Sequence, residues 1–154
     1  ILREVIEAAK LLKEDFGVAS DIWSAPSFTE LQRDGVDANR WNMLHPDKKP
    51  RQSYVEQCLA NRKGPVIAAT DYVRLFADQI RNFVPRRYVT LGTDGFGRSD
   101  VRTQLRKFFE VDRYYVAVAA LKALADEGTI PAKKVSDAIK KYGIDPEKPN
   151  PITV

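Results

Sequence analysis

The strongest candidate for chemistry in this sequence is the glycine-rich string at residues 92–99, which reads GTDGFGRS. Backbone amides at the start of a helix attract phosphate or carboxylate groups, and glycines let the backbone approach such an anion closely. The string is therefore compatible with an anion-binding turn formed by Gly95, Gly97, Arg98 and a helix-capping Ser99. Its G-x-x-G-x-G order differs from the dinucleotide and P-loop fingerprints, so we favour a structural turn that needs glycine only for positive φ and close packing, and anion binding stays open as the alternative.

The single histidine, His45, and the single cysteine, Cys58, are the next candidates. A thiolate paired with an imidazole could act as a nucleophile. However, a proline-rich loop separates the two residues, and no third group stands out to orient the pair. We therefore interpret His45 as a residue that caps a helix end and Cys58 as a small packing residue. A lone thiol also fits a reducing compartment, and we expect a cytoplasmic protein.

The acidic pairs Asp94 with Asp100 and Asp71 with Asp78 do not have the spacing of metal ligands. Helix caps and solvated faces explain them more simply. We expect no catalytic residue, no cofactor-binding residue and no metal ligand in this chain.

The composition excludes several classes of protein. The chain has 154 residues, of which 44% are hydrophobic and 30% charged, and this is enough to form one domain with one core. No apolar run is long enough to cross a bilayer. The 25 Lys and Arg residues are set against 21 Asp and Glu residues and are not gathered with stacking aromatics, so we expect neither nucleic-acid nor membrane binding.

The elements that must position these residues alternate between amphipathic helices and short apolar runs. Helices are expected over residues 1–16, 27–34, 37–44, 53–59, 71–84, 99–109, 112–127 and 131–142, and strands over 18–24, 65–70 and 88–91. Ser27, Ser53, Asp71, Ser99 and Asp112 stand at or near the expected helix starts, with Asp71, Ser99 and Asp112 as caps and Ser27 opening a capping box. The wholly apolar run at 65–70 is typical of a strand buried on both faces.

This alternation predicts an α/β fold with three layers, α/β/α, around a mostly parallel, mixed sheet. Residues 1–144 are expected to form the domain and residues 145–154 a proline-rich tail. A helix that opens such a fold normally follows a strand, so we expect a first strand to be missing before Ile1 and the chain to be a fragment. One sheet edge and a large apolar patch should then be uncovered.

Several strings, in this order and spacing, resemble the transketolase-like C-terminal domain of the homodimeric, bacterial-type pyruvate dehydrogenase decarboxylating components. They are IWS at 22–24, SFTEL at 27–31, RWNMLHP at 40–46, ATDY at 69–72, LFA at 75–77, LGTDGFGRSD at 91–100 and FEVD at 109–112. The shorter F-G-x-S element is shared more widely among transketolase-like enzymes.

The resemblance implies a thiamine-diphosphate enzyme that decarboxylates pyruvate and passes the acetyl group to a lipoyl group on dihydrolipoamide acetyltransferase. It implies a homodimer in which other domains hold thiamine diphosphate and Mg²⁺, while this domain serves as scaffold and dimer support. Thr93-Asp94-Gly95 looks like part of the family's Gly-Asp-Gly cofactor motif, but no asparagine pair follows it, so no catalytic position is transferred to this chain.

Two alternatives stay open beside this resemblance. The first is a free-standing α/β binding module with an anion site at the Gly92–Ser99 turn. The second, nucleic-acid binding, depends only on the basic pI and the arginines.

Overall fold

The computed structural model describes all residues from Ile1 to Val154. Its helices are α1 (Leu2–Phe16), α2 (Phe28–Leu44), α3 (Tyr54–Leu59), α4 (Arg74–Asp78), α5 (Arg102–Phe108), α6 (Arg113–Asp126) and α7 (Ala132–Lys141), and its strands are β1 (Val66–Ala69) and β2 (Tyr88–Leu91). A short 3-10 helix follows α4 at Arg81–Phe83. None of the helices combines the length and apolar composition that crossing a membrane would require.

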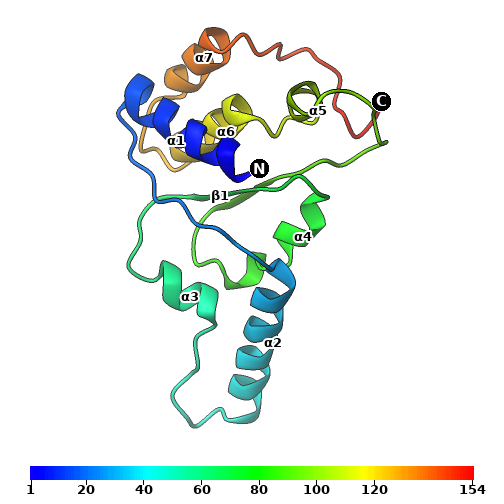
Figure 1. The fold of residues 1–154 in the computed structure, drawn as a ribbon. Helices are drawn as coiled ribbons and strands as arrows, with labels where there is room; N and C mark the ends of the chain where they lie inside the picture. The colour runs from blue at the N-terminus through cyan, green and yellow to red at the C-terminus, as the bar shows by residue number, and fades with distance from the viewer.

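The two strands run parallel and form the middle layer, with Val66 opposite Tyr88 and Ala69 opposite Leu91. Helices α1, α6 and α7 lie on one face of the strands, and α2, α3 and α4 lie on the other (Figure 1). The predicted three-layer α/β fold is therefore confirmed. The sheet has only two strands, however, and they run parallel to each other, so it is not the mixed sheet that was predicted.

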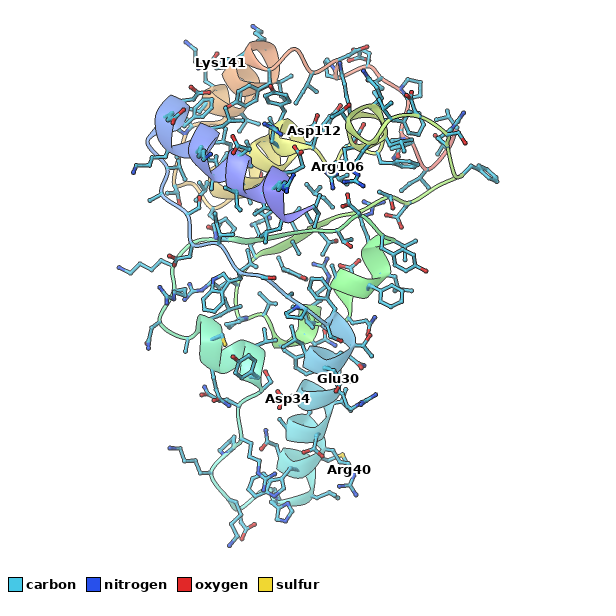
Figure 2. The ribbon with its side chains drawn as sticks, in the orientation of Figure 1. Glu30, Asp34, Arg40, Arg106, Asp112 and Lys141 are labelled. Atoms are coloured by element: carbon cyan, nitrogen blue, oxygen red, sulfur yellow. The ribbon has the colours of Figure 1, made fainter.

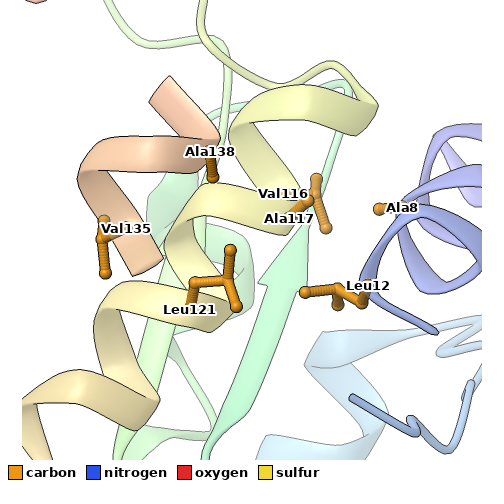
Figure 3. Close-up of a cluster of buried hydrophobic side chains, with 7 residues drawn as sticks. All are labelled: Ala8, Leu12, Val116, Ala117, Leu121, Val135 and Ala138. Atoms are coloured by element: carbon orange, nitrogen blue, oxygen red, sulfur yellow. The ribbon is translucent and has the colours of Figure 1, made fainter. Parts of the chain in front are cut away.

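The larger hydrophobic core lies between α1, α6, α7 and one face of the strands. Figure 3 shows its seven buried side chains: Ala8, Leu12, Val116, Ala117, Leu121, Val135 and Ala138. Three of them are alanines at helix contacts, so α1 and α7 can approach α6 closely. Glycine ends α1 as predicted, because Gly17 adopts a left-handed conformation with φ of 68°.

A second, smaller core lies on the opposite face and consists of Val55, Ile80, Phe83, Val84 and Tyr88. The Tyr88 hydroxyl donates a hydrogen bond to the Ala77 carbonyl at 2.8 Å. Gly35 does not interrupt α2, contrary to the prediction. A Cβ at this position would lie 2.6 Å from the ring of Phe83, so glycine is needed for the close approach of α2 to this core.

The predicted strand at residues 18–24 is wrong. These residues follow α1 without joining a sheet, and residues 19–26 take part in no backbone hydrogen bond. A strand needs a neighbouring strand for its backbone groups, and no strand lies directly beside this segment. For the same reason β1 is only half-buried along its whole length, and not buried on both faces as predicted.

Of the predicted helix starts, those with a local hydrogen-bond partner are confirmed. Ser27 caps α2 as predicted, because its hydroxyl accepts from the backbone amide of Glu30 at 3.2 Å, and the Asp112 carboxylate accepts from the backbone amides of Tyr114 and Tyr115. The full capping box, however, forms at Ser53 with Glu56, where it was not predicted. The predicted cap at Asp71 is wrong, since α4 begins only at Arg74 and the Asp71 carboxylate binds elsewhere.

The last ten residues contain no helix or strand, but they pack on the domain. The Lys148 ammonium donates to the Phe108 carbonyl at 2.8 Å and pairs with Glu110 at 2.9 Å. Pro151 is buried, and its carbonyl oxygen occupies the space that a Cβ on Gly95 would need.

Candidate functional site

The glycine-rich turn begins directly after β2 and lies against the start of α4. A Cβ at Gly92 would lie 2.7 Å from the Tyr72 carbonyl oxygen and from the Arg74 nitrogen. Gly95 has a φ of 110°, which side-chain-bearing residues rarely adopt. Two of the glycines are therefore explained by backbone packing and backbone conformation alone.

The predicted cap at Ser99 is wrong. Helix α5 begins at Arg102, its N-cap is Val101, and no side chain caps it. The backbone amide of Val101 donates to the Asp100 carboxylate at 2.6 Å, so the side-chain contact next to the helix start comes from Asp100 and not from Ser99. Because α5 has only seven residues and starts beyond the turn, the turn does not deliver a ligand to a helix N-terminus.

A hollow of about 630 Å³ lies beside the turn, and Gly95, Gly97 and Arg98 line it together with Arg102 and Arg106. The structure thus brings three of the four predicted anion-site residues together and leaves Ser99 out. The Arg98 guanidinium lies over the Phe108 ring at 5.0 Å. Neither Arg98 nor Arg102 forms an ion pair, so two positive charges face this hollow without a carboxylate partner.

Arg106, by contrast, belongs to a cluster of charged residues that the sequence did not predict. Its guanidinium donates to the Asp71 carboxylate at 2.7 and 2.9 Å. It also contacts Glu4 at 3.5 Å, and Glu4 accepts from the Arg113 guanidinium at 2.9 Å. Figure 2 shows Arg106 directed from α5 towards the N-terminal end of α1. The cluster joins α1, α5, α6 and the end of β1.

The electrostatics of this cluster follow from its hydrogen bonds. The hydrogen bond from Arg106 lowers the pKa of Asp71 to about 2, and that from Arg113 lowers the pKa of Glu4 below its ordinary value. Both carboxylates are therefore ionised and neutralised near pH 7. This is the charge pattern of a structural cluster and not of a general acid or base, which needs a pKa near the working pH.

One feature of the sequence could have revealed this cluster. Glu4, Ala8 and Leu12 are spaced four residues apart, so they lie on one face of α1, and all three are buried. A carboxylate on the buried face of a helix requires a cationic partner. The sequence does not identify that partner, because Arg113 lies 109 positions away.

The remaining candidates have local structural roles. The Asp94 carboxylate pairs with the Arg74 guanidinium at 2.7 Å. His45 stacks on Trp41 with ring centroids 4.4 Å apart and hydrogen bonds to the Trp41 carbonyl. Cys58 lies on α3 and makes no hydrogen bond to His45. No group of three His, Cys, Asp or Glu side chains is close enough to hold a metal ion.

Comparison with known proteins decides the family. Residues 1–112 match the family described as the transketolase-like TK C-terminal domain. This chain belongs to that family. The match ends at Asp112, the N-cap of α6, so the two helices that complete the larger core lie beyond it.

The relatives of this domain give the finer comparison. The chain is 67% identical over its whole length to the pyruvate dehydrogenase E1 component of Cupriavidus necator. It is 65% identical over 99% of its length to that of Pseudomonas aeruginosa and 56% identical over 98% to that of Escherichia coli K12. It spans 17% of the length of each of these relatives. The resemblance predicted from the sequence strings is therefore confirmed.

Proposed function

We propose that this chain is the C-terminal domain of a pyruvate dehydrogenase E1 component. In the proposed enzyme, other domains bind thiamine diphosphate and Mg²⁺ and decarboxylate pyruvate, and the acetyl group passes to the lipoyl group of dihydrolipoamide acetyltransferase. The enzyme would be a cytoplasmic homodimer. The observation that carries this proposal is the 67% identity to a protein of that name along the entire chain.

The side chains of this domain do not fit the cofactor. Magnesium bound to a diphosphate prefers several oxygen ligands in octahedral geometry. Asp94, in the string that looks like part of a cofactor motif, is already paired with Arg74, and Asp71 is already paired with Arg106. We therefore assign no catalytic step to a residue of this chain and propose that the domain acts as scaffold.

Exposed apolar side chains support the proposed part in dimer formation. Tyr72, Leu75 and Phe76 at α4 are all exposed, as are Phe96 and Val101 in the loop after β2. Tyr72 and Phe76 stack edge to face at 5.0 Å. Exposed apolar groups near the same end of the strands are typical of a surface that another domain or subunit covers.

The test compares the full-length protein with a version that ends before Ile1. We expect the full-length protein to transfer acetyl groups from pyruvate to a lipoyl acceptor when thiamine diphosphate and Mg²⁺ are present. The shortened protein should lose activity and dimerisation together. Calorimetry that found a magnesium-dependent, micromolar thiamine diphosphate site in the 154-residue chain alone would contradict the scaffold role.

The hollow beside the glycine-rich turn supports one alternative, a binding module for a phosphate or carboxylate. Arg98→Ala should then weaken the binding of a phosphate analogue. Arg40→Ala is the matched control, because Arg40 lies near the far end of α2 (Figure 2). Negligible binding in both variants and in the unchanged protein would reject this alternative.

A further inference from the structure

Helix α2 carries a second apolar stripe that no other element of the fold covers. On its inner side, Gly35 and Ala38 are buried against the rest of the domain. On its outer side, Val36, Met43 and Leu44 are 49%, 71% and 53% exposed. These three residues lie at positions i, i+7 and i+8, which places them on one face of a helix. A helix with an apolar stripe on each side is suited to pack against two neighbours, and the fold supplies only one.

The last turns of α2 and the loop after it extend beyond the other helices (Figure 1) and are strongly basic. Residues 40–51 contain four Lys and Arg residues and one acidic residue, so their net charge is +3, whereas that of the whole chain is +4. The acidic residue, Asp47, pairs with its neighbour Lys48 at 3.5 Å. The other three cations form no ion pair: Arg40, Lys49 and Arg51. Unpaired positive charge therefore lies beside the outer apolar stripe.

The loop after α2 is ordered by contacts with the end of the helix. The Asn42 side chain accepts from the Arg51 backbone amide at 2.7 Å and donates to the Arg51 carbonyl at 2.9 Å. The Arg51 guanidinium lies over the Trp41 ring at 4.2 Å, and His45 stacks on the same ring. A surface whose charged groups are already ordered loses little conformational entropy when a partner binds.

We propose that the outer face of α2 and this loop, residues 36–51, bind an acidic amphipathic helix of a partner protein. We call this surface the α2 tip. The apolar side chains of the partner helix pack on the outer apolar stripe, as ridges of one helix fill grooves of another. Its carboxylates lie beside Arg40 and Arg51, since a planar guanidinium binds a carboxylate with two hydrogen bonds. The proposal does not depend on the reaction proposed above.

Two other occupants fit the α2 tip less well. A two-fold contact with a second copy of this chain places a surface against itself, so the cations of one tip would face those of the other. A single-stranded nucleic acid needs aromatic rings that are free to stack on its bases, but His45 and Arg51 already contact the Trp41 ring. A nucleic acid also leaves the exposure of Met43 and Leu44 unexplained.

The test is acetylation of lysines in the full-length protein, followed for each residue by mass spectrometry with and without an acidic peptide. The probe is a synthetic peptide of about 16 residues, with leucine at every third or fourth position and glutamate elsewhere. We expect saturating peptide to slow the acetylation of Lys48 and Lys49 about fivefold, because the bound helix covers them. Lys133 and Lys140 of α7 are the internal controls, since both are exposed and form no ion pair. Their acetylation should not change.

Charge reversal identifies the surface independently. Lys49→Glu combined with Arg51→Glu should weaken binding of the labelled peptide about tenfold, as measured by fluorescence anisotropy. Lys133→Glu combined with Lys140→Glu changes the net charge equally but on α7, so binding should stay within about twofold. Met43→Ser combined with Leu44→Ser should also weaken binding, because it removes the apolar part of the contact.

Four results would overturn the proposal. The peptide could protect no lysine, or it could protect the lysines of α7 as strongly as Lys48 and Lys49, which would reduce the effect to net charge. Lys48 and Lys49 could resist acetylation without peptide, which would show that the full-length protein already covers the α2 tip. A single-stranded oligonucleotide of thymidine could protect these lysines better than the peptide, which would make a nucleic acid the occupant.

Discussion

One face of the strand layer is covered more completely than the free edge of β1. On one face, α1, α6 and α7 enclose a core whose central residue, Leu121, has no exposed surface. Along the free edge of β1, by contrast, Ile22 and Trp23 are about half exposed beside a large hollow. The difference shows that helices brought together by local packing can complete a core, whereas the outer edge of β1 has no neighbouring strand to cover it.

The largest change in the free energy of unfolding should come from the core on the covered face. Leu121→Ala should lower the free energy of unfolding by about 3 kcal/mol, because it leaves a cavity in a core that cannot collapse. Ile22→Ala at the open edge should cost less than about 1 kcal/mol, since that side chain is still exposed. Urea denaturation measures both, and equal costs would show that the two sides do not differ.

The second test uses the charged cluster that joins α1, α5 and α6 to the carboxyl end of β1. Glu4→Gln should cost about 2 kcal/mol, because it leaves the Arg113 guanidinium without its buried carboxylate partner. Glu7→Gln removes a surface carboxylate that pairs with Lys10 at 2.7 Å and lies 3.9 Å from Arg113, so it should leave the urea midpoint almost unchanged. A cost for Glu7→Gln as large as that for Glu4→Gln would contradict this role for burial.

The C-terminal tail provides a smaller test at the end of the strands. Gly95→Ala should destabilise the protein by about 1–2 kcal/mol, because its φ of 110° is strained for alanine and Pro151 blocks the added Cβ. Gly97→Ala has open space around it and should have almost no effect. Proteolysis should also remove the tail faster in Gly95→Ala, and equal rates in the two variants would show that Pro151 does not hold it.

The smallest expected effect is the dependence of stability on pH. The pKa of Asp71 is lowered from 3.8 to about 2 by its hydrogen bond with Arg106. Its contribution is therefore present above the unfolded pKa and lost as the pH falls from about 4 towards 2. Asp71→Asn should flatten the decline of the urea midpoint in this range. An unchanged slope would show that this ion pair contributes little.

The sequence predicted those parts of the fold that depend on near neighbours. Gly17 ends α1 and Asp112 caps α6, because each uses backbone groups within a few residues. Asp71 resembles a helix cap equally well, yet its carboxylate binds Arg106, which lies 35 positions further along the chain. The period-two pattern at residues 18–24 is that of a strand, but pattern alone cannot supply the neighbour that a strand requires.

The candidate site shows the same contrast between contacts of near neighbours in the chain and contacts of distant residues. Gly95, Gly97 and Arg98 line one hollow, as their closeness in the chain requires, and their role as an anion site stays a prediction. The predicted cap at Ser99 was wrong, since α5 begins only at Arg102 and has no side-chain cap. Sequence spacing missed the pairing of Glu4 with Arg113 entirely, because that contact exists only after α1 and α6 have packed.

The two tryptophans provide fluorescent reporters for two different parts of the molecule. Trp41 is enclosed near the end of α2 by His45 and by Arg51, whose guanidinium lies 4.2 Å from the ring. Trp23 lines the hollow beside β1. Emission of a Trp41→Phe protein would therefore come from Trp23 alone, and a shift to shorter wavelength would report when water leaves that edge.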